Sequence, residues 1–266
     1  MQANKAIRKN AAGILFSRGN IYTMSLGICL CIAAAIVPII LAGVISSFAY
    51  EAAESVSLTL DIVAILTFVI FLIFVTVPTL GSFFEMSYRL YRGQETHVAE
   101  VLSPFCAPRR YFRTLRVWLM LSLRMLVLAA IPFAAFGLTS ITDMMFGDVE
   151  LLMNLSSVVI WLFAAVAFCA AGFFMVSFFL APYLVCQGYS GRRAMLMSAK
   201  LTAKKWGRIW KYLLGFSGLF ALSLLTVGML FVVYTAPVMI FAYFIYAEKM
   251  INDQSKNIER GNENEG

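Results

Sequence analysis

Long apolar stretches separated by shorter polar segments dominate the pattern along the 266-residue chain. A bilayer core about 30 Å thick needs about 20 apolar residues of helix, so a stretch of that length predicts a membrane span. The sequence predicts an all-α, polytopic integral membrane bundle of six transmembrane helices, with basic amphipathic segments on the cytoplasmic side and one transmembrane domain over residues 1–250. The predicted spans cover residues 24–48, 60–80, 117–138, 155–184, 212–229 and 231–248.

The last apolar stretch, from Tyr212 to Ala247, supplies two of these six spans. As a single helix its 36 residues would be about 54 Å long at a rise of 1.5 Å per residue, which is too long for one span. Gly228 lies near the middle, and glycine permits the backbone to reverse direction there. We therefore expect two short spans joined by a tight turn at residues 227–230; the alternative is one long or broken helix.

Lys and Arg are distributed unevenly between the predicted loops. Apart from Arg124, they lie in the N-terminal segment, in residues 81–116 and 185–211, and in the C-terminal tail. Residues 49–59 and 139–154 contain carboxylates but no Lys or Arg. Because loops rich in Lys and Arg face the cytoplasm, we expect a multi-pass protein of the cell membrane with both termini in the cytoplasm.

Composition supports this interpretation and excludes others. With 61% hydrophobic and 13% charged residues, the chain has too few charges to cover a soluble domain. The net charge of +7 lies between the apolar stretches, so we expect no nucleic acid partner. The run from Met24 to Phe48 is too long for a signal peptide. The polar segment over residues 251–266 lacks an apolar period and predicts a disordered cytoplasmic tail.

Two basic segments repeat each other at an offset of 95 residues, RRYFRTLRVW from Arg109 and KKWGRIWKYL from Lys204. At 100° per residue, three of the four cations in each segment lie on one face of a helix. Each segment is therefore expected to lie in the cytoplasmic interface of the membrane and to contact anionic lipid headgroups. The residues predicted to make these contacts are Arg109, Arg110, Arg113, Arg116, Lys204, Lys205, Arg208 and Lys211.

Prolines show a second regularity. Pro38 and Pro132 lie in the first and third predicted spans, whereas Pro78, Pro182 and Pro237 lie in the second, fourth and sixth. An interior proline frees a backbone carbonyl and bends the helix, which a membrane tolerates if a neighbouring group bonds to that carbonyl. The predicted repeat is thus a basic segment, a span, an outer turn and a proline-bearing span.

The quoted motifs also resemble a known family. GSFFEMSYRLYRG, RRYFRTLRVW, FFLAPYLV, AMLMSAKLTAKKWGRIWKYLLGFSGLF and TAPVMIFAYFIY together resemble the small bacterial multi-pass family catalogued as domain of unknown function 975. The resemblance covers about residues 78–247, and that family is itself similar to the membrane domain accompanying glycerophosphodiester phosphodiesterases. It implies a six-helix bacterial membrane protein with no assigned activity. No phosphodiesterase site carries over, because the chain has one histidine and no soluble catalytic domain.

Arg124 is a candidate intramembrane charge, eight residues beyond Arg116 within the third predicted span. Charges inside a membrane are costly and often functional, so a contact with an anionic substrate or a lipid phosphate is one interpretation. The other, which we favour, is a side chain that extends toward the cytoplasmic headgroups.

The remaining polar residues predict no catalytic or metal-binding set. His97, Glu95 and Glu100 share one polar segment, but a metal site needs three or four converging ligands. Asp61 and Glu85 lie near the ends of the second predicted span, where an ordinary span end explains them. The five cysteines form no C-x-x-C pair and are expected to be structural thiols. We expect no catalytic residue, no cofactor and no metal ion.

The pattern favours a non-enzymatic protein that acts through lipid or protein contacts in the cell envelope. The alternative is a small transporter or channel-like permease subunit, since transporters often combine repeats with discontinuous helices. A membrane-embedded enzyme that acts on lipid has the least support. A packed apolar interior would favour the first class, whereas a polar cavity near the middle of the membrane would favour the second. Protein partners and homo-oligomers stay open.

Overall fold

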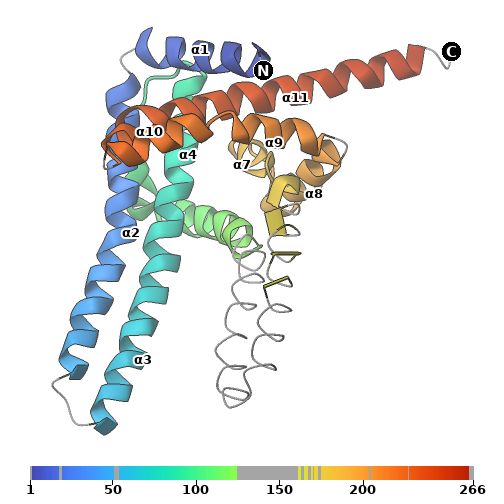
Figure 1. Cartoon of the computed structure of the whole chain (residues 1–266). Helices are drawn as coiled ribbons and strands as arrows, with labels where there is room; N and C mark the ends of the chain where they lie inside the picture. The colour runs from blue at the N-terminus through green and yellow to red at the C-terminus, as the bar shows by residue number, and fades with distance from the viewer. Residues whose placement is uncertain are drawn as a thin grey trace.

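All regular structure in the described part of this computed structural model is helical (Figure 1). Four of the helices there are long and apolar enough to cross a membrane: Asn20–Phe48, Ile62–Tyr91, Trp206–Leu225 and Phe231–Asp253. The expectation of an all-helical membrane protein is confirmed at this level. The described residues are 2–17, 20–50, 54–124, 161–162, 165–166, 169, 171–172, 175–203, 205–226 and 228–263.

The first helical hairpin pairs α2 (Asn20–Tyr50) with α3 (Glu54–Phe71). Apolar side chains remain on the outside of this pair: Ile40 of α2 is 58% exposed and Ile65 of α3 is 62% exposed. Water solvates such a surface poorly, whereas hydrocarbon chains of lipid do so at little cost. The exposed faces of the hairpin are therefore suited to contact with lipid.

A proline interrupts the helical hydrogen bonds where α3 gives way to α4. A π-helical turn, η1 (Leu72–Thr76), connects α3 to α4 (Val77–Tyr91), whose second residue is Pro78. Because proline has no N–H, the carbonyl of Phe74 loses its helical partner. The Tyr111 hydroxyl donates a hydrogen bond to this carbonyl at 2.7 Å. A side chain from a distant segment thus satisfies the backbone group that the proline leaves open.

The same compensation occurs inside α2. Pro38 removes the hydrogen bond that would reach the carbonyl of Ala34. The Thr76 hydroxyl, from the end of η1, donates to that carbonyl at 2.8 Å. The π-helical turn η1 therefore supplies the group that compensates the proline of α2.

A second hairpin forms from the last apolar stretch of the sequence. Its turn contains Gly228, whose φ of +79° lies in the left-handed region that favours glycine. The stretch is divided there into two helical arms, Trp206–Leu225 and Phe231–Asp253. The elements of the hairpin are α9 (Trp206–Leu214), α10 (Ser217–Leu225), η3 (Phe231–Thr235) and α11 (Ala236–Glu263).

The proline of α11 also follows a π-helical turn. η1 and η3 both end in a buried threonine, Thr76 or Thr235, and both lead through one residue into a proline. The carbonyl that Pro237 frees belongs to Val233, and the Ser25 hydroxyl lies 3.5 Å from it. That distance is long for a hydroxyl donor. The repeat of proline-bearing helices therefore extends to their local backbone geometry, although the compensating bonds differ in quality.

Aromatic side chains join three proline-bearing helices, α4, α7 (Ala181–Cys186) and α11. Phe84 of α4 contacts Phe244 of α11 edge to face, with ring centroids 6.4 Å apart. The Tyr243 hydroxyl accepts the N–H of Tyr183 at 3.0 Å and donates to the carbonyl of Phe179 at 2.9 Å. Because Tyr183 lies in the first turn of α7, its N–H has no partner within the helix. Tyr243 thereby holds the start of α7 against α11.

The N-terminal helix α1 (Gln2–Ser17) packs against α11 (Figure 1). Ile7, Ala11 and Leu15 recur every four residues and are at most 7% exposed, so they form the packed face of α1. Arg8 donates to the carbonyl of Gly215 at 2.8 Å, where α9 ends. A cation at a helix C-terminus is favourable because the last carbonyls carry partial negative charge.

Figure 1 shows α10 and α11 running across the direction of α2 and α3 rather than alongside them. Four candidate spans are present in the described part of the chain, so the predicted number of six is not confirmed. The first, second, fifth and sixth predicted spans overlap the four candidate spans. Of the third, residues 117–138, the structure describes only 117–124, and of the fourth, residues 155–184, it describes 161–162, 165–166, 169, 171–172 and 175–184.

The C-terminal segment also differs from its prediction. Residues 251–263 continue α11 as helix, although their sequence predicts a disordered tail. Between Ile251 and Arg260 the segment has neither Gly nor Pro, and Lys, Gln and Glu are good helix formers, so an existing helix is extended at low cost.

Candidate functional site

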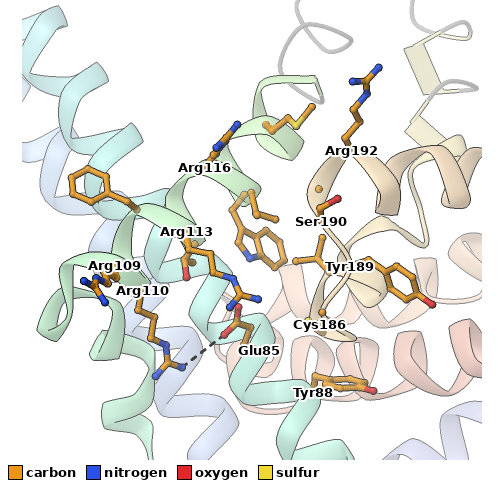
Figure 2. Close-up of a pocket in the computed structure, with 18 of the residues that line it drawn as sticks. Glu85, Tyr88, Arg109, Arg110, Arg113, Arg116, Cys186, Tyr189, Ser190 and Arg192 are labelled. Carbon is orange, nitrogen blue, oxygen red and sulfur yellow. Dashed lines mark ion pairs between the residues drawn. The ribbon is translucent and has the colours of Figure 1, made fainter.

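A large open cavity lies between α4, the helix over residues 108–124 and the turn that leads from α7 into α8 (Gly191–Thr202) (Figure 2). Its volume is about 1440 Å³, above the usual range of about 300–1,000 Å³ for small-ligand pockets. Six arginines and one carboxylate line it. These charged residues are Glu85, Arg89, Arg109, Arg110, Arg113, Arg116 and Arg192.

Four of the arginines lie on the helix over residues 108–124, which is amphipathic. Leu115, Trp118 and Leu121 are at most 7% exposed and form its packed side. Trp118 lies directly against Gly81 of α4, where an added Cβ would be 2.5 Å from the indole Cδ1. Close packing on α4 therefore fixes this helix, and its basic side is left to face the cavity.

The opposite wall begins at the turn after α7. Gly188 has a φ of +95°, a left-handed conformation that lets the chain reverse before α8. Gly191 starts α8 and is buried, and a Cβ there would be 3.4 Å from the carbonyl oxygen of Val117. The first turn of α8 can therefore approach the helix over residues 108–124, which brings Arg192 to the cavity opposite Arg116 (Figure 2).

The cavity holds more positive than negative charge. Arg89 pairs with Glu100 at 3.0 Å, and Arg110 pairs with Glu85 at 3.8 Å (Figure 2). Cations gathered around one space repel each other, and a bound anion would relieve this repulsion. Within the described part of the chain, no carboxylate lies within 4.0 Å of the four other arginines, which are Arg109, Arg113, Arg116 and Arg192.

A small cavity of about 300 Å³ lies between α1, α9 and α11. It is lined by basic residues from α9 and α11 and by Asn4 and Ile7 from α1. Tyr246 and Met250 of α11 complete its wall. Its charged lining residues are Lys205, Arg208, Lys211, Lys249 and Asp253.

The backbone of the second basic segment differs from that of the first. α8 ends at Thr202 and α9 begins at Trp206, so Lys205 lies at the helix start instead of on a continuous helix. Its Nζ donates to the carbonyl of Met250 at 3.3 Å. Burial lowers the pKa of Lys205 below the ordinary 10.5, Asp253 opposes that change, and Arg208 adds to it. An anion bound nearby would favour the charged form of this lysine.

The predicted lipid-contact residues separate into these two cavities. Arg109, Arg110, Arg113 and Arg116 all line the large cavity, and Lys205, Arg208 and Lys211 line the small one. Lys204 lies outside the described residues. Arg124 is exposed at the end of the described part of its helix and is not among the lining residues of either cavity.

Sequence reasoning missed three cationic residues of the cavities. Arg89, Arg192 and Lys249 were counted only as charges that orient the chain in the membrane, because none of them belongs to the repeated segments. Glu85 was assigned to a span end, but it lines the large cavity and pairs with Arg110. Only the packing of α4, α8 and α11 against the basic segments brings these residues to the cavities.

The polar residues around His97 form no recognisable catalytic site. His97 precedes the 3₁₀ helix η2 (Val98–Cys106), and Glu100 is occupied by its ion pair with Arg89. In the ranges that the structure describes, no group of three or more His, Cys, Asp or Glu side chains is placed to hold a metal ion.

Comparisons with known proteins found no family model, no curated protein and no solved structure that matches this chain. The resemblance to domain of unknown function 975 remains a prediction from the sequence.

Proposed function

We propose that this protein is a non-enzymatic integral membrane protein that binds the phosphate of an anionic lipid headgroup in the large cavity. The observation that carries the proposal is the set of arginines at this cavity that have no carboxylate partner in the described part of the chain. The planar guanidinium group can donate two parallel hydrogen bonds to a phosphate, which makes arginine a preferred residue for phosphate recognition.

The surroundings of the cavity support a lipid as the source of this phosphate. Phe112 lines the cavity and is 62% exposed, and Leu123 on the same helix is 54% exposed. Apolar and cationic side chains on one helix are typical of the membrane interface, where acyl chains and headgroups meet. Because Lys and Arg concentrate in cytoplasmic segments, the proposed lipid belongs to the cytoplasmic leaflet of the cell membrane.

The test compares lipid binding by matched variants. The full-length protein is placed in nanodiscs that contain phosphatidylglycerol and phosphatidylcholine, and the lipid retained on release is measured by native mass spectrometry. Arg113→Gln combined with Arg116→Gln removes two cavity cations and should reduce the preference for phosphatidylglycerol about tenfold, or ~1.4 kcal/mol. Arg193→Gln combined with Lys200→Gln removes the same charge from exposed positions of α8 outside the cavity lining and should change little.

Two outcomes would contradict the proposal. Equal retention by the wild type and the Arg113→Gln/Arg116→Gln variant would show that these arginines only orient the protein in the membrane. If glycerol 3-phosphate displaces the phosphatidylglycerol completely at equal concentration, the ligand is a soluble phosphate rather than a lipid.

A specific observation also favours a second candidate, a small transporter or channel-like subunit. The π-helical turn before a proline occurs in both α3–α4 and η3–α11, and discontinuous helices in repeated units often surround transport sites. Counterflow of radiolabelled glycerol 3-phosphate in proteoliposomes tests this function. Uptake that the Arg113→Gln/Arg116→Gln variant abolishes would support transport, and uptake no faster than in empty liposomes would argue against transport of this probe.

A further inference from the structure

The small cavity between α1, α9 and α11 shares no lining residue with the large cavity. Its volume of about 300 Å³ lies at the lower end of the range for small-ligand pockets. Three separate elements build its wall, so it exists only while α1 is packed against the second hairpin. A site here would act independently of the arginines of the large cavity.

Four cations and one carboxylate surround this small space. Within the described residues, Arg208, Lys211 and Lys249 form no ion pair with Asp253 or with any other carboxylate. Lys205 uses one of its three donors on the carbonyl of Met250. The cavity therefore keeps a surplus of about three positive charges close together, which an anion would balance.

Arg8 of α1 does not contribute to that surplus. Arg8 donates to the carbonyl of Gly215 at 2.8 Å, and its guanidinium lies over the ring of Phe216, 5.7 Å from the centroid. α1 instead brings Asn4 and Ile7 to the cavity. The helix thus closes one side of the cavity with an amide and an apolar side chain, and leaves the cations of α9 and α11 facing the space.

Part of the wall is apolar. Ile7 is 7% exposed and Met250 is 5% exposed, and the Tyr246 ring stacks on Tyr212 with centroids 4.4 Å apart. A ligand that suits this wall combines a compact anion with a short organic part. A phosphomonoester carries about −1.5 to −2 charges at pH 7, so it balances the surplus better than a monoanionic phosphodiester does.

We propose that the small cavity binds a phosphomonoester group, with the phosphate among Arg208, Lys211 and Lys249 and the organic part against Ile7 and Met250. Two molecules present this group, a free phosphomonoester such as glycerol 3-phosphate and the headgroup of phosphatidic acid. The proposal does not depend on lipid binding in the large cavity.

Titration of the full-length protein with glycerol 3-phosphate, in phosphatidylcholine nanodiscs and followed by isothermal calorimetry, tests the site. Arg208→Gln combined with Lys211→Gln should weaken binding about tenfold or more. Lys5→Gln combined with Lys9→Gln removes the same charge from exposed positions of α1 that do not line the cavity and should change affinity less than about twofold. Equal losses in both variants would show nonspecific attraction and overturn the proposal.

A parallel experiment with phosphatidic acid incorporated in the nanodiscs distinguishes a lipid headgroup from a free phosphomonoester. Retention of phosphatidic acid that depends on Arg208 and Lys211, without binding of glycerol 3-phosphate, assigns the lipid headgroup. Binding of neither probe by the wild type overturns the proposal.

Hydrogen exchange reports whether the ligand binds beside α1, which a measurement of folding alone would not show. Because Asn4 and Ile7 form part of the wall, bound ligand should slow amide exchange in α1 about threefold or more. The Arg113→Gln/Arg116→Gln variant of the large cavity should show the same protection as the wild type. Loss of protection in that variant would show that the two cavities form one site, which contradicts the proposal of a separate one.

Discussion

The helix pair α3–α4 and the segment η3–α11 share one local pattern in different surroundings. Each has a five-residue π-helical turn that ends in a buried threonine, followed by one residue and a proline. α4 continues the line of a membrane hairpin and borders the large cavity, whereas α11 runs across that hairpin and borders the small one (Figure 1). The same local break therefore occurs in two helices with different orientations. We infer that the packing around each break determines the direction of its helix.

The residue three positions beyond the proline differs between the two helices and affects how closely a neighbouring helix can pack. In α4 this position is Gly81, which lets Trp118 reach the backbone, and in α11 it is Ile240, which is partly buried among apolar side chains. The absence of a side chain in α4 lets a neighbouring helix approach, and that helix carries the arginines of the large cavity. α11 has no such opening and receives α1 at a different face. Four experiments test this comparison, in order of decreasing expected effect.

Gly81→Ala should have the largest effect. The new Cβ would lie 2.5 Å from Trp118 Cδ1, so the helix over residues 108–124 must move, which should lower the free energy of unfolding by about 2–3 kcal/mol. Thermal denaturation in detergent, followed by tryptophan fluorescence, measures the loss. Gly43→Ala in α2 is the matched control, because nothing lies within 4 Å of its added Cβ. Equal melting temperatures for wild type and Gly81→Ala would disprove the close approach.

Thr76→Val should cost about 1–2 kcal/mol of unfolding free energy, since it leaves the Ala34 carbonyl beside Pro38 without a hydrogen bond. Thr235→Val should cost less than ~1 kcal/mol. Its partner Ser223 also donates to the carbonyl of Leu219 at 2.7 Å and stays satisfied. Denaturation of both variants under identical conditions measures the difference, and a larger loss for Thr235→Val would reverse the comparison of the two breaks.

The two cavities should respond differently to pH. Burial lowers the pKa of Lys205 below 10.5. The negative charge of Asp253 raises this pKa, and the positive charge of Arg208 lowers it further. A bound anion would raise the pKa again. Affinity of the small cavity for glycerol 3-phosphate should therefore be full near pH 7 and fall about threefold as the pH rises toward 10.5 and Lys205 loses its proton. The large cavity depends on arginines, which stay charged above pH 12. The contrast is tested at pH 7 and pH 10, with calorimetry of glycerol 3-phosphate for the small cavity and lipid retention for the large one. Equal losses of affinity in the two cavities would contradict it.

Ser25→Ala should have the smallest effect, below ~0.5 kcal/mol of unfolding free energy, because the Ser25 hydroxyl is 3.5 Å from the Val233 carbonyl. Tyr111→Phe, which removes the 2.7 Å bond to Phe74 at the corresponding carbonyl, is the informative comparison and should cost more. A Ser25→Ala loss as large as that of Tyr111→Phe would mean that the two proline breaks are equally well compensated.

The sequence predicted the features that depend on local pattern. Apolar length identified the spans that the structure describes, and Gly228 identified the turn of the second hairpin. The spacing of Arg109, Arg113 and Arg116 identified a basic helix face before any cavity was known. These signals are short range, so a single sequence carries them.

Features that depend on packing were not predictable in the same way. Apolar length does not specify direction, so nothing in the sequence indicated that α11 runs across α2. Arg89 and Arg192 lie on different helices from the basic segment that they join, and no spacing rule connects them. The hydroxyls that compensate the prolines come from Thr76, Tyr111 and Ser25, each on another part of the chain, and hydrophobicity gives no sign of them.

The docking of α1 has a consequence for the order of assembly during synthesis. Asn4 and Arg8 bond to carbonyls that lie 207 residues further along the chain, at Lys211 and Gly215. When α1 leaves the ribosome, its docking surface has not yet been made. α1 must therefore wait at the membrane surface with its apolar face against lipid, and its attachment to the second hairpin closes a very long loop as one of the last steps of folding.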